Sequence, residues 1–104
     1  MSKITQIIQD VLTERARQDA MYGAPPRNLK PTFYLPILTE ELGEVARTIL
    51  EGDSLGYRRE LIQLAAVAIA AIEEFDSGEA TGHLELVCRP SIKYQAELDG
   101  RDPD

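Results

Sequence analysis

The sequence predicts an all-α fold: a compact bundle of three main antiparallel helices and a short C-terminal segment, completed by oligomerisation. Three stretches repeat apolar residues at the three-and-four spacing of one helix face, and segments with glycine and proline separate them. The third stretch is apolar almost all round, which is typical of a helix covered on every side. Because two neighbouring helices in a chain of 104 residues do not cover such a helix, we expect an oligomer.

The composition indicates one globular domain over residues 1–104. Hydrophobic residues make up 43% and charged residues 28%, which is the balance of a folded protein rather than a disordered one. Acidic residues outnumber basic ones by 18 to 11, giving a formal net charge of −7. We therefore expect neither nucleic acid nor a membrane as partner, since both favour a basic surface. A small phosphorylated ligand is compatible with this charge if metal cations or a local basic cluster accompany it.

The cysteine content and the first residues fit a cytoplasmic protein. Cys88 is the single cysteine, which excludes an intrachain disulfide and a metal-binding cysteine pair. Residues 1–11 lack the apolar run of a signal peptide. The longest apolar run, residues 64–72, is too short to cross a bilayer.

The first helix is expected from Ser2 to Met21, with Ser2 or Thr5 as its N-terminal cap. Its apolar face consists of Ile4, Ile7, Ile8, Val11 and Leu12. The segment 22–33 ends this helix because it contains Gly23 and the Pro25-Pro26 pair. With about a dozen residues it is long for a small bundle, which favours a functional role.

The second helix is expected from Leu35 to Leu50, with Pro36 in its first turn and Gly52 beyond its end. Its apolar stripe consists of Leu38, Leu42, Val45, Ala46 and Ile49. The short link that follows, residues 51–57, favours antiparallel packing of the next helix.

The third helix is expected from Leu55 or Tyr57 to Phe75, and Gln63 is the one polar residue between positions 61 and 72. We expect the interface of the oligomer to use this helix. The pattern weakens after it. Three later segments have weaker expectations: a short helix or a strand at 83–88, a short fourth helix capped by Ser91 at 91–98, and a weakly ordered end at about 98–104.

Four glutamates and one glutamine form the candidate site. At about 100° per residue, Glu41 lies at the edge of the apolar stripe, Glu44 lies beside it, and Glu40 points nearly opposite the stripe. Glu60 and Gln63 form a matching pair on the third helix, which faces Glu41 and Glu44 if the helices pack antiparallel. Convergent carboxylates repel one another unless a cation neutralises them, and Mg²⁺ prefers such oxygen ligands. The alternative is a solvated acidic face near a helix start.

The motifs around these residues resemble a known family. The stretch "EELGE" at 40–44, followed sixteen residues after Glu44 by "ELIQ" at 60–63, resembles the EExxE, spacer, ExxD pattern of the MazG-like all-α nucleoside triphosphate pyrophosphohydrolases. The stretch "ERARQDAMYG" at 14–23 resembles a segment of many small members. The resemblance covers about residues 8 to 75. It implies a helical bundle that dimerises or tetramerises and cleaves (d)NTP to (d)NMP and pyrophosphate with Mg²⁺, or with Mn²⁺ in its place.

The resemblance also implies roles for single residues. Glu41, Glu44 and Glu60 match metal-binding acids, with Gln63 as a fourth ligand, and Glu40 matches the first glutamate of the motif. Glu40 or Glu41 would orient or deprotonate the attacking water. Gln63 stands where the family pattern has Asp, which removes one negative charge from the metal cluster. The alternative function is therefore a catalytically impaired nucleotide-binding or helical interaction protein of the same fold.

Basic side chains are expected to meet the substrate phosphates, and the candidates are Arg15, Arg17, Lys30, Arg58 and Arg59. Each of these also fits a solvated surface cation. Gln18 and Asp19 are expected at the nucleoside, and Tyr22 either stacks on the base or packs as a core aromatic. His83 and Cys88 lack neighbours with metal or catalytic spacing. A di-iron bundle is disfavoured because there is no Glu-x-x-His motif.

Overall fold

The computed structural model describes residues 2–27 and 29–77, which form three α-helices and no strand. The helices are α1 at Lys3–Tyr22, α2 at Pro31–Glu51 and α3 at Ser54–Asp76. The expected all-α class is therefore confirmed for this part of the chain. The segments expected at 83–88, 91–98 and 98–104 lie outside it, as do His83 and Cys88. None of the described helices is long and apolar enough to span a membrane.

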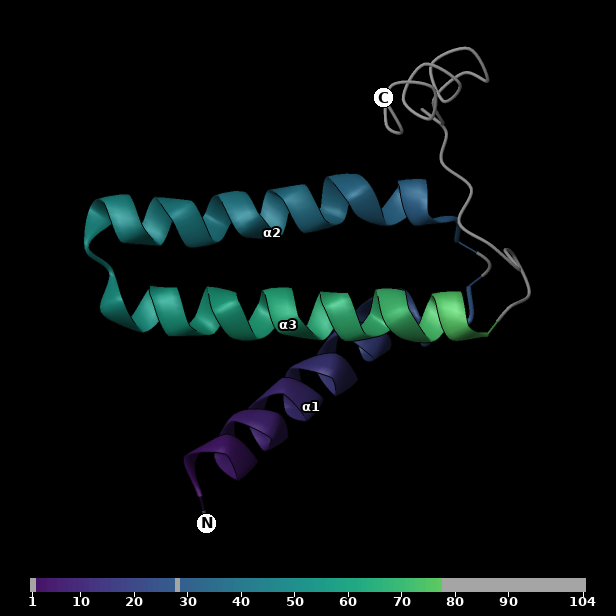
Figure 1. Ribbon diagram of the computed structural model, residues 1–104, viewed down its shortest axis with the longest axis horizontal. Helices are drawn as coiled ribbons and strands as arrows, with labels where there is room; N and C mark the ends of the chain where they lie inside the picture. The colour runs from purple at the N-terminus through teal and green to yellow at the C-terminus, as the bar shows by residue number, and fades with distance from the viewer. Residues whose placement is uncertain (1, 28, 78–104) are drawn as a thin grey trace, which may run out of the picture.

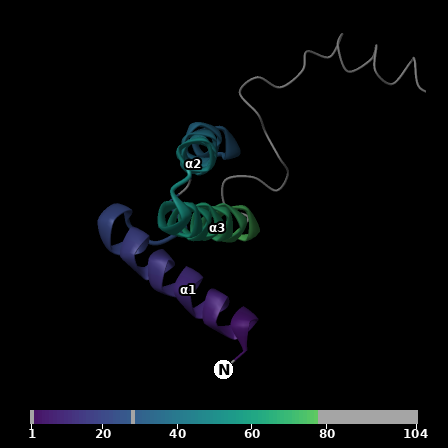
Figure 2. The same ribbon diagram turned by 90° about the vertical axis from the view of Figure 1, so that its left-hand side faces the viewer.

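The central helix of this arrangement is α3. It runs antiparallel beside α2, and α1 crosses its other side obliquely (Figures 1 and 2). Within the described residues α1 and α2 do not pack against each other. The expectation of three antiparallel helices therefore holds for α2 and α3 and not for α1. The buried residues of α1 are Val11 and Arg15, so its first turns are free to diverge from α3.

The caps of α1 and α2 follow the sequence expectations. Ser2 caps α1, because its hydroxyl accepts a hydrogen bond from the Thr5 backbone N–H at 3.2 Å. Gly52 ends α2 in a left-handed conformation at φ 70°, where a side chain would be strained. Asp53 then caps α3, which begins at Ser54, so the link between α2 and α3 is residues 52–53 and is shorter than the expected 51–57.

The second helix begins four residues earlier than the sequence predicts, at Pro31 instead of Leu35. Proline fits the first helical position because its missing N–H has no helical partner there. As a result Pro36 lies inside α2 and not in its first turn, and the expected long linker shortens to residues 23–30.

The core lies where α2 faces α3. Tyr34, Val67 and Ala70 are buried, and Leu29, Leu38 and Ala71 pack against them. The buried face of α2 runs through Tyr34, Leu38, Glu41, Val45 and Thr48. Leu38 and Val45 of the expected apolar stripe lie on this face, but Leu42 and Ile49 of the same stripe are 58% and 61% exposed, so the expected stripe was centred too far from the buried face. Glu41 therefore lies within the face that α2 turns toward α3, and not at its edge.

The linker is tied to the C-terminal part of α3. The backbone N–H of Arg27 donates to both carboxylate oxygens of Glu74, at 2.9 and 3.0 Å. Tyr34 donates its hydroxyl to the same carboxylate at 3.4 Å. Glu74 is 4% exposed, so this carboxylate is buried beneath the linker it holds.

Candidate functional site

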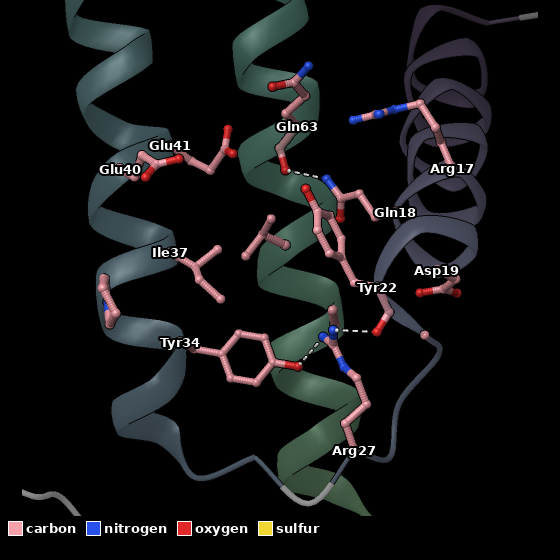
Figure 3. Close-up of a pocket in the computed structure, with 14 residues that line it drawn as sticks. Arg17, Gln18, Asp19, Tyr22, Arg27, Tyr34, Ile37, Glu40, Glu41 and Gln63 are labelled. Carbon is pink, nitrogen blue, oxygen red and sulfur yellow. Dashed lines mark hydrogen bonds between the residues drawn. The ribbon is translucent and has the colours of Figure 1, made fainter.

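A groove of about 320 Å³ opens between α1 and α2, with α3 as its floor (Figure 3). We refer to it as the interhelical groove. It exists because α1 and α2 each contact α3 and leave the space between them open. Its lining comes from all three helices and the linker: Arg17, Gln18, Asp19, Tyr22, Gly23, Arg27, Tyr34, Pro36, Ile37, Glu40, Glu41, Gln63, Val67 and Ala70.

Carboxylates gather at one end of the groove, around Glu41. This side chain is half-buried, and its Oε2 atom is buried without a hydrogen-bond partner among the described residues. Burial raises the pKa of Glu41, and the negative charges of Glu60, Glu40, Glu44 and Glu14 raise it further. Acids of all three helices therefore act on this one carboxyl group.

The structure brings together most of the predicted metal ligands. Glu60 is buried, with its Oε1 atom 3.9 Å from the Nε atom of Arg59. Gln63 lines the groove with Glu40 and Glu41. Glu44 is close enough to affect Glu41 but forms an ion pair with Arg47. No three His, Cys, Asp or Glu side chains within residues 2–27 and 29–77 form a recognisable metal-binding group.

Glu14 on α1 is a member of this cluster that sequence reasoning missed. It accepts hydrogen bonds from Arg17 at 2.6 and 2.9 Å and from the side chain of Gln18 at 3.0 Å. The hydrogen bond from Arg17 lowers the pKa of Glu14. Gln18 also donates to the backbone oxygen of Gln63 at 3.4 Å (Figure 3). The signal for Glu14 lies within the quoted "ERARQD" stretch, one helical turn before Gln18.

Of the predicted cations, Arg17 lines the groove and the others lie outside its lining. Arg15 is 8% exposed and pairs with Asp19 at 3.2 Å and with Glu73. Lys30 is the residue that precedes α2.

Two more of these cations, Arg58 and Arg59, line a separate hollow between α1 and α3. Arg58 pairs there with Asp10 at 2.7 Å, and this hydrogen bond lowers the pKa of Asp10. Glu14 also lines this hollow, and Arg59 lies within 3.9 Å of the Glu60 carboxylate.

The other end of the groove is built around Arg27, which sequence reasoning also missed. Its guanidinium donates to the hydroxyl of Tyr34 at 2.9 Å and to the backbone oxygen of Tyr22 at 3.4 Å (Figure 3). Burial raises the pKa of Tyr34. Tyr22 is 64% exposed and lines the groove, so it is not a core aromatic. The sequence contains no signal for Arg27, because its partner Glu74 lies 47 residues away in the chain and no local spacing connects the two.

The arrangement combines crowded carboxylates at one end with Arg27 and Tyr34 at the other, and the ring of Tyr22 lies between them beside Gln18 (Figure 3). This suits a ligand with a charged and a flat part. No family model, curated protein or solved structure matches the chain. The assignment of a function therefore depends on the residues of the groove and on the sequence motifs that line it.

Proposed function

We propose that the chain is a Mg²⁺-dependent nucleoside triphosphate pyrophosphohydrolase that cleaves (d)NTP to (d)NMP and pyrophosphate in the interhelical groove. The observation that carries the proposal is Glu41, whose buried oxygen has no hydrogen-bond partner within the described residues and whose neighbours are carboxylates of three helices. The resemblance of "EELGE", "ELIQ" and "ERARQDAMYG" to the MazG-like enzymes supports the same function. All three motifs contribute residues to the lining of the groove.

The residues at the carboxylate end fit a hard divalent cation. A cation removes the penalty of holding Glu41 ionised beside Glu60, Glu40 and Glu44, and it provides the partner that Oε2 of Glu41 lacks among the described residues. All donors here are oxygen atoms, including the amide oxygen of Gln63, which suits Mg²⁺ and also Mn²⁺. We assign the ion to Glu41, Glu44, Glu60 and Gln63. When bound, it supplies positive charge to phosphate oxygens.

The remaining chemistry belongs to side chains of the groove. Hydrolysis joins a water oxygen to one phosphorus of the α–β anhydride and breaks the bond from that phosphorus to the bridging oxygen, so the nucleoside monophosphate and pyrophosphate separate. Glu40, exposed at the rim of the groove, accepts the proton of the attacking water, with Glu41 as the alternative base. Arg17 extends from the opposite wall toward α3 and neutralises phosphate charge (Figure 3). Asp19 and Tyr22 are assigned to the nucleoside.

The second candidate function is nucleotide binding without turnover. Two observations favour it: Gln63 replaces an acid of the family pattern, and the Glu44 carboxylate is engaged by Arg47. A neutral amide in place of a carboxylate weakens the attraction for a divalent ion, while the rest of the groove keeps its shape and its cations.

A homo-oligomer, as dimer or tetramer, belongs to the same proposal. In the single chain Ile4, Ile8 and Leu12 of α1 are 61%, 51% and 56% exposed. Leu42 and Ile49 of α2 are exposed to a similar degree, and α3 leaves Leu61 38% exposed. Exposed apolar side chains in this number support the expectation that another chain covers part of this surface.

The test is pyrophosphate release from a panel of ribo- and deoxyribonucleoside triphosphates, with and without Mg²⁺. The variant Glu41→Gln removes the central charge, and Glu51→Gln is its control, since Glu51 is an exposed acid of α2 outside the groove lining. We expect metal-dependent release that is lost in Glu41→Gln and kept in Glu51→Gln. Nucleotide binding by a folded protein without release from any triphosphate would favour the second candidate.

A further inference from the structure

The two ends of the interhelical groove differ in chemistry and are separated by about the length of an extended nucleotide. Tyr34 and Glu41 lie seven positions apart on α2. At about 1.5 Å per residue this places them roughly 10 Å apart along the helix axis. Ile37 lies between them and faces the groove, and Val67 belongs to its floor (Figure 3). A nucleotide with its phosphates at Glu41 therefore reaches Tyr34 with its base.

Arg27 is held in place at this second end from two sides. Its backbone N–H donates to both oxygens of the buried Glu74, at 2.9 and 3.0 Å. Its guanidinium donates to Tyr34 at 2.9 Å, and its central carbon lies 5.9 Å from the centre of the Tyr34 ring. A side chain fixed in this way before a ligand arrives loses little conformational entropy on binding.

The guanidinium of Arg27 offers hydrogen-bond donors and no acceptor. Among the described residues its two terminal nitrogen atoms each make one hydrogen bond, to Tyr22 and to Tyr34, and its Nε is buried without a partner. Each terminal nitrogen carries a second N–H, and these two donors are the pair that a ligand can use. Asp19, the acidic residue of α1 in the lining, is paired with Arg15 at 3.2 Å. A base that enters the Arg27 end of the groove therefore faces the hydrogen-bond donors of the Arg27 guanidinium.

We propose that Arg27 selects the base, favouring a 6-oxopurine nucleotide over a 6-aminopurine nucleotide, with Glu74 as the residue that positions Arg27. A 6-oxopurine presents two acceptors, O6 and N7, on one edge, and a guanidinium binds such an edge with two hydrogen bonds. Adenine places an amino donor where O6 would be, so one guanidinium donor faces another donor. The proposal rests on the proposed function, which places the phosphates at the carboxylate end.

The test compares inosine and adenosine nucleotides, which differ on this edge in the group at position 6. We would measure kcat and KM for ITP and ATP, and the affinities of IMP and AMP by calorimetry, which needs no turnover. The wild-type protein is expected to favour the inosine nucleotides by about tenfold or more, the discrimination of a two-bond arginine contact. The preference should appear mainly in KM and in affinity.

The central variant is Arg27→Met, which keeps much of the length of the side chain and removes its donors. We expect it to abolish the preference by weakening inosine nucleotides and leaving adenosine nucleotides nearly unchanged. Arg27→Lys keeps the charge but not the planar pair of donors, so it should also lose most of the preference. Glu74→Gln should reduce the preference with Arg27 still present. Lys3→Met, which removes a cation outside the groove, should change nothing.

Equal loss of inosine and adenosine nucleotides in Arg27→Met would overturn the proposal, since Arg27 would then hold a phosphate or the fold. Equal affinity of wild-type protein for IMP and AMP would overturn it as well. Absence of turnover with every triphosphate overturns the proposed hydrolysis instead. In that case an Arg27-dependent preference for IMP over AMP still supports the assignment of Arg27.

Discussion

The guanidinium of Arg15 on α1 forms an ion pair with the carboxylate of Glu73 on α3, 58 residues later in the chain. The same guanidinium bonds Asp19 one turn further along α1, and Arg15 is only 8% exposed. This pair attaches the middle of α1 near the C-terminal end of α3, and it therefore holds one wall of the interhelical groove against the floor.

Replacement of Arg15 by Met should lower the free energy of unfolding by about 1–3 kcal/mol, because it removes hydrogen bonds between charged groups at a mostly buried side chain. Urea denaturation followed by circular dichroism measures this change. Arg58→Met is the matched control, since Arg58 pairs with Asp10 at an exposed site and such pairs contribute about 0–1 kcal/mol. Equal losses in both variants would contradict the role given to Arg15.

The raised pKa of Glu41 predicts that this residue destabilises the metal-free fold at neutral pH. The folded protein holds the proton more tightly than the unfolded chain, so stability falls as pH rises through the raised pKa. With a chelator present at pH 7, the Glu41→Gln variant should therefore have a higher melting temperature than the wild-type protein. The difference should disappear below the ordinary carboxyl range of about pH 4. A Glu41→Gln protein that melts lower at pH 7 would show that the carboxylate stabilises the fold.

Magnesium should stabilise the wild-type protein through the same residue. At a free concentration of one hundred times Kd, a ligand that binds the folded state alone adds about 2.7 kcal/mol to the free energy of unfolding. Thermal melts across a Mg²⁺ titration should show the rise for wild type and for Glu51→Gln, and no rise for Glu41→Gln. If the melting temperature of the wild-type protein does not change with Mg²⁺, either with or without nucleotide, the support for a metal site is removed.

Gln63→Asp tests the departure from the family pattern. The added charge joins Glu41 and Glu60, so it should lower stability in a chelator and tighten Mg²⁺ binding. Gln9→Asp, on an exposed position of α1, controls for one added charge. Thermal melting in a chelator measures the loss of stability, and thermal melting in Mg²⁺ measures the tighter binding of the ion. Unchanged Mg²⁺ affinity in Gln63→Asp would place this side chain outside the metal cluster.

The exposed apolar face of α1 predicts association in solution. Ile8→Lys should shift the protein from dimer or tetramer toward monomer, because a desolvated ammonium at an apolar interface is costly. Light scattering after size-exclusion chromatography gives the mass directly. Thr13→Lys, exposed on the same helix, is the control and should leave the mass unchanged. A wild-type protein that is already monomeric would refute the expectation.

Features set by neighbouring residues were predictable from the sequence. The cap formed by Ser2, the left-handed Gly52 and the short link to α3 each depend on a few adjacent positions, and the structure confirms them. The start of α2 was not predicted, because both Pro31 and Pro36 fit a first turn and the pattern alone does not choose between them.

The orientation of α2 was mispredicted for a different reason. Its most apolar stripe contains Leu42 and Ile49, and periodicity selects the most apolar stripe as the buried one. Packing instead buries the face with Tyr34, Glu41 and Thr48, which is less apolar. The sequence nevertheless identified Glu41, Glu60 and Gln63 as neighbours, because antiparallel pairing of α2 and α3 requires only a short link.

The two walls of the interhelical groove do not pack against each other in the described part of the chain: α1 and α2 are joined through α3 and through the linker, where Arg27 bonds both Tyr22 and Tyr34. Any tilt of α1 changes the width of the groove without disturbing the antiparallel pair of α2 and α3. The contacts that oppose such widening are the interface between α1 and α3 and the hydrogen bonds from the backbone N–H of Arg27 to the Glu74 carboxylate. We therefore expect ligands of different thickness to be accommodated by the angle of α1, while α2 and α3 present the same surface to each of them.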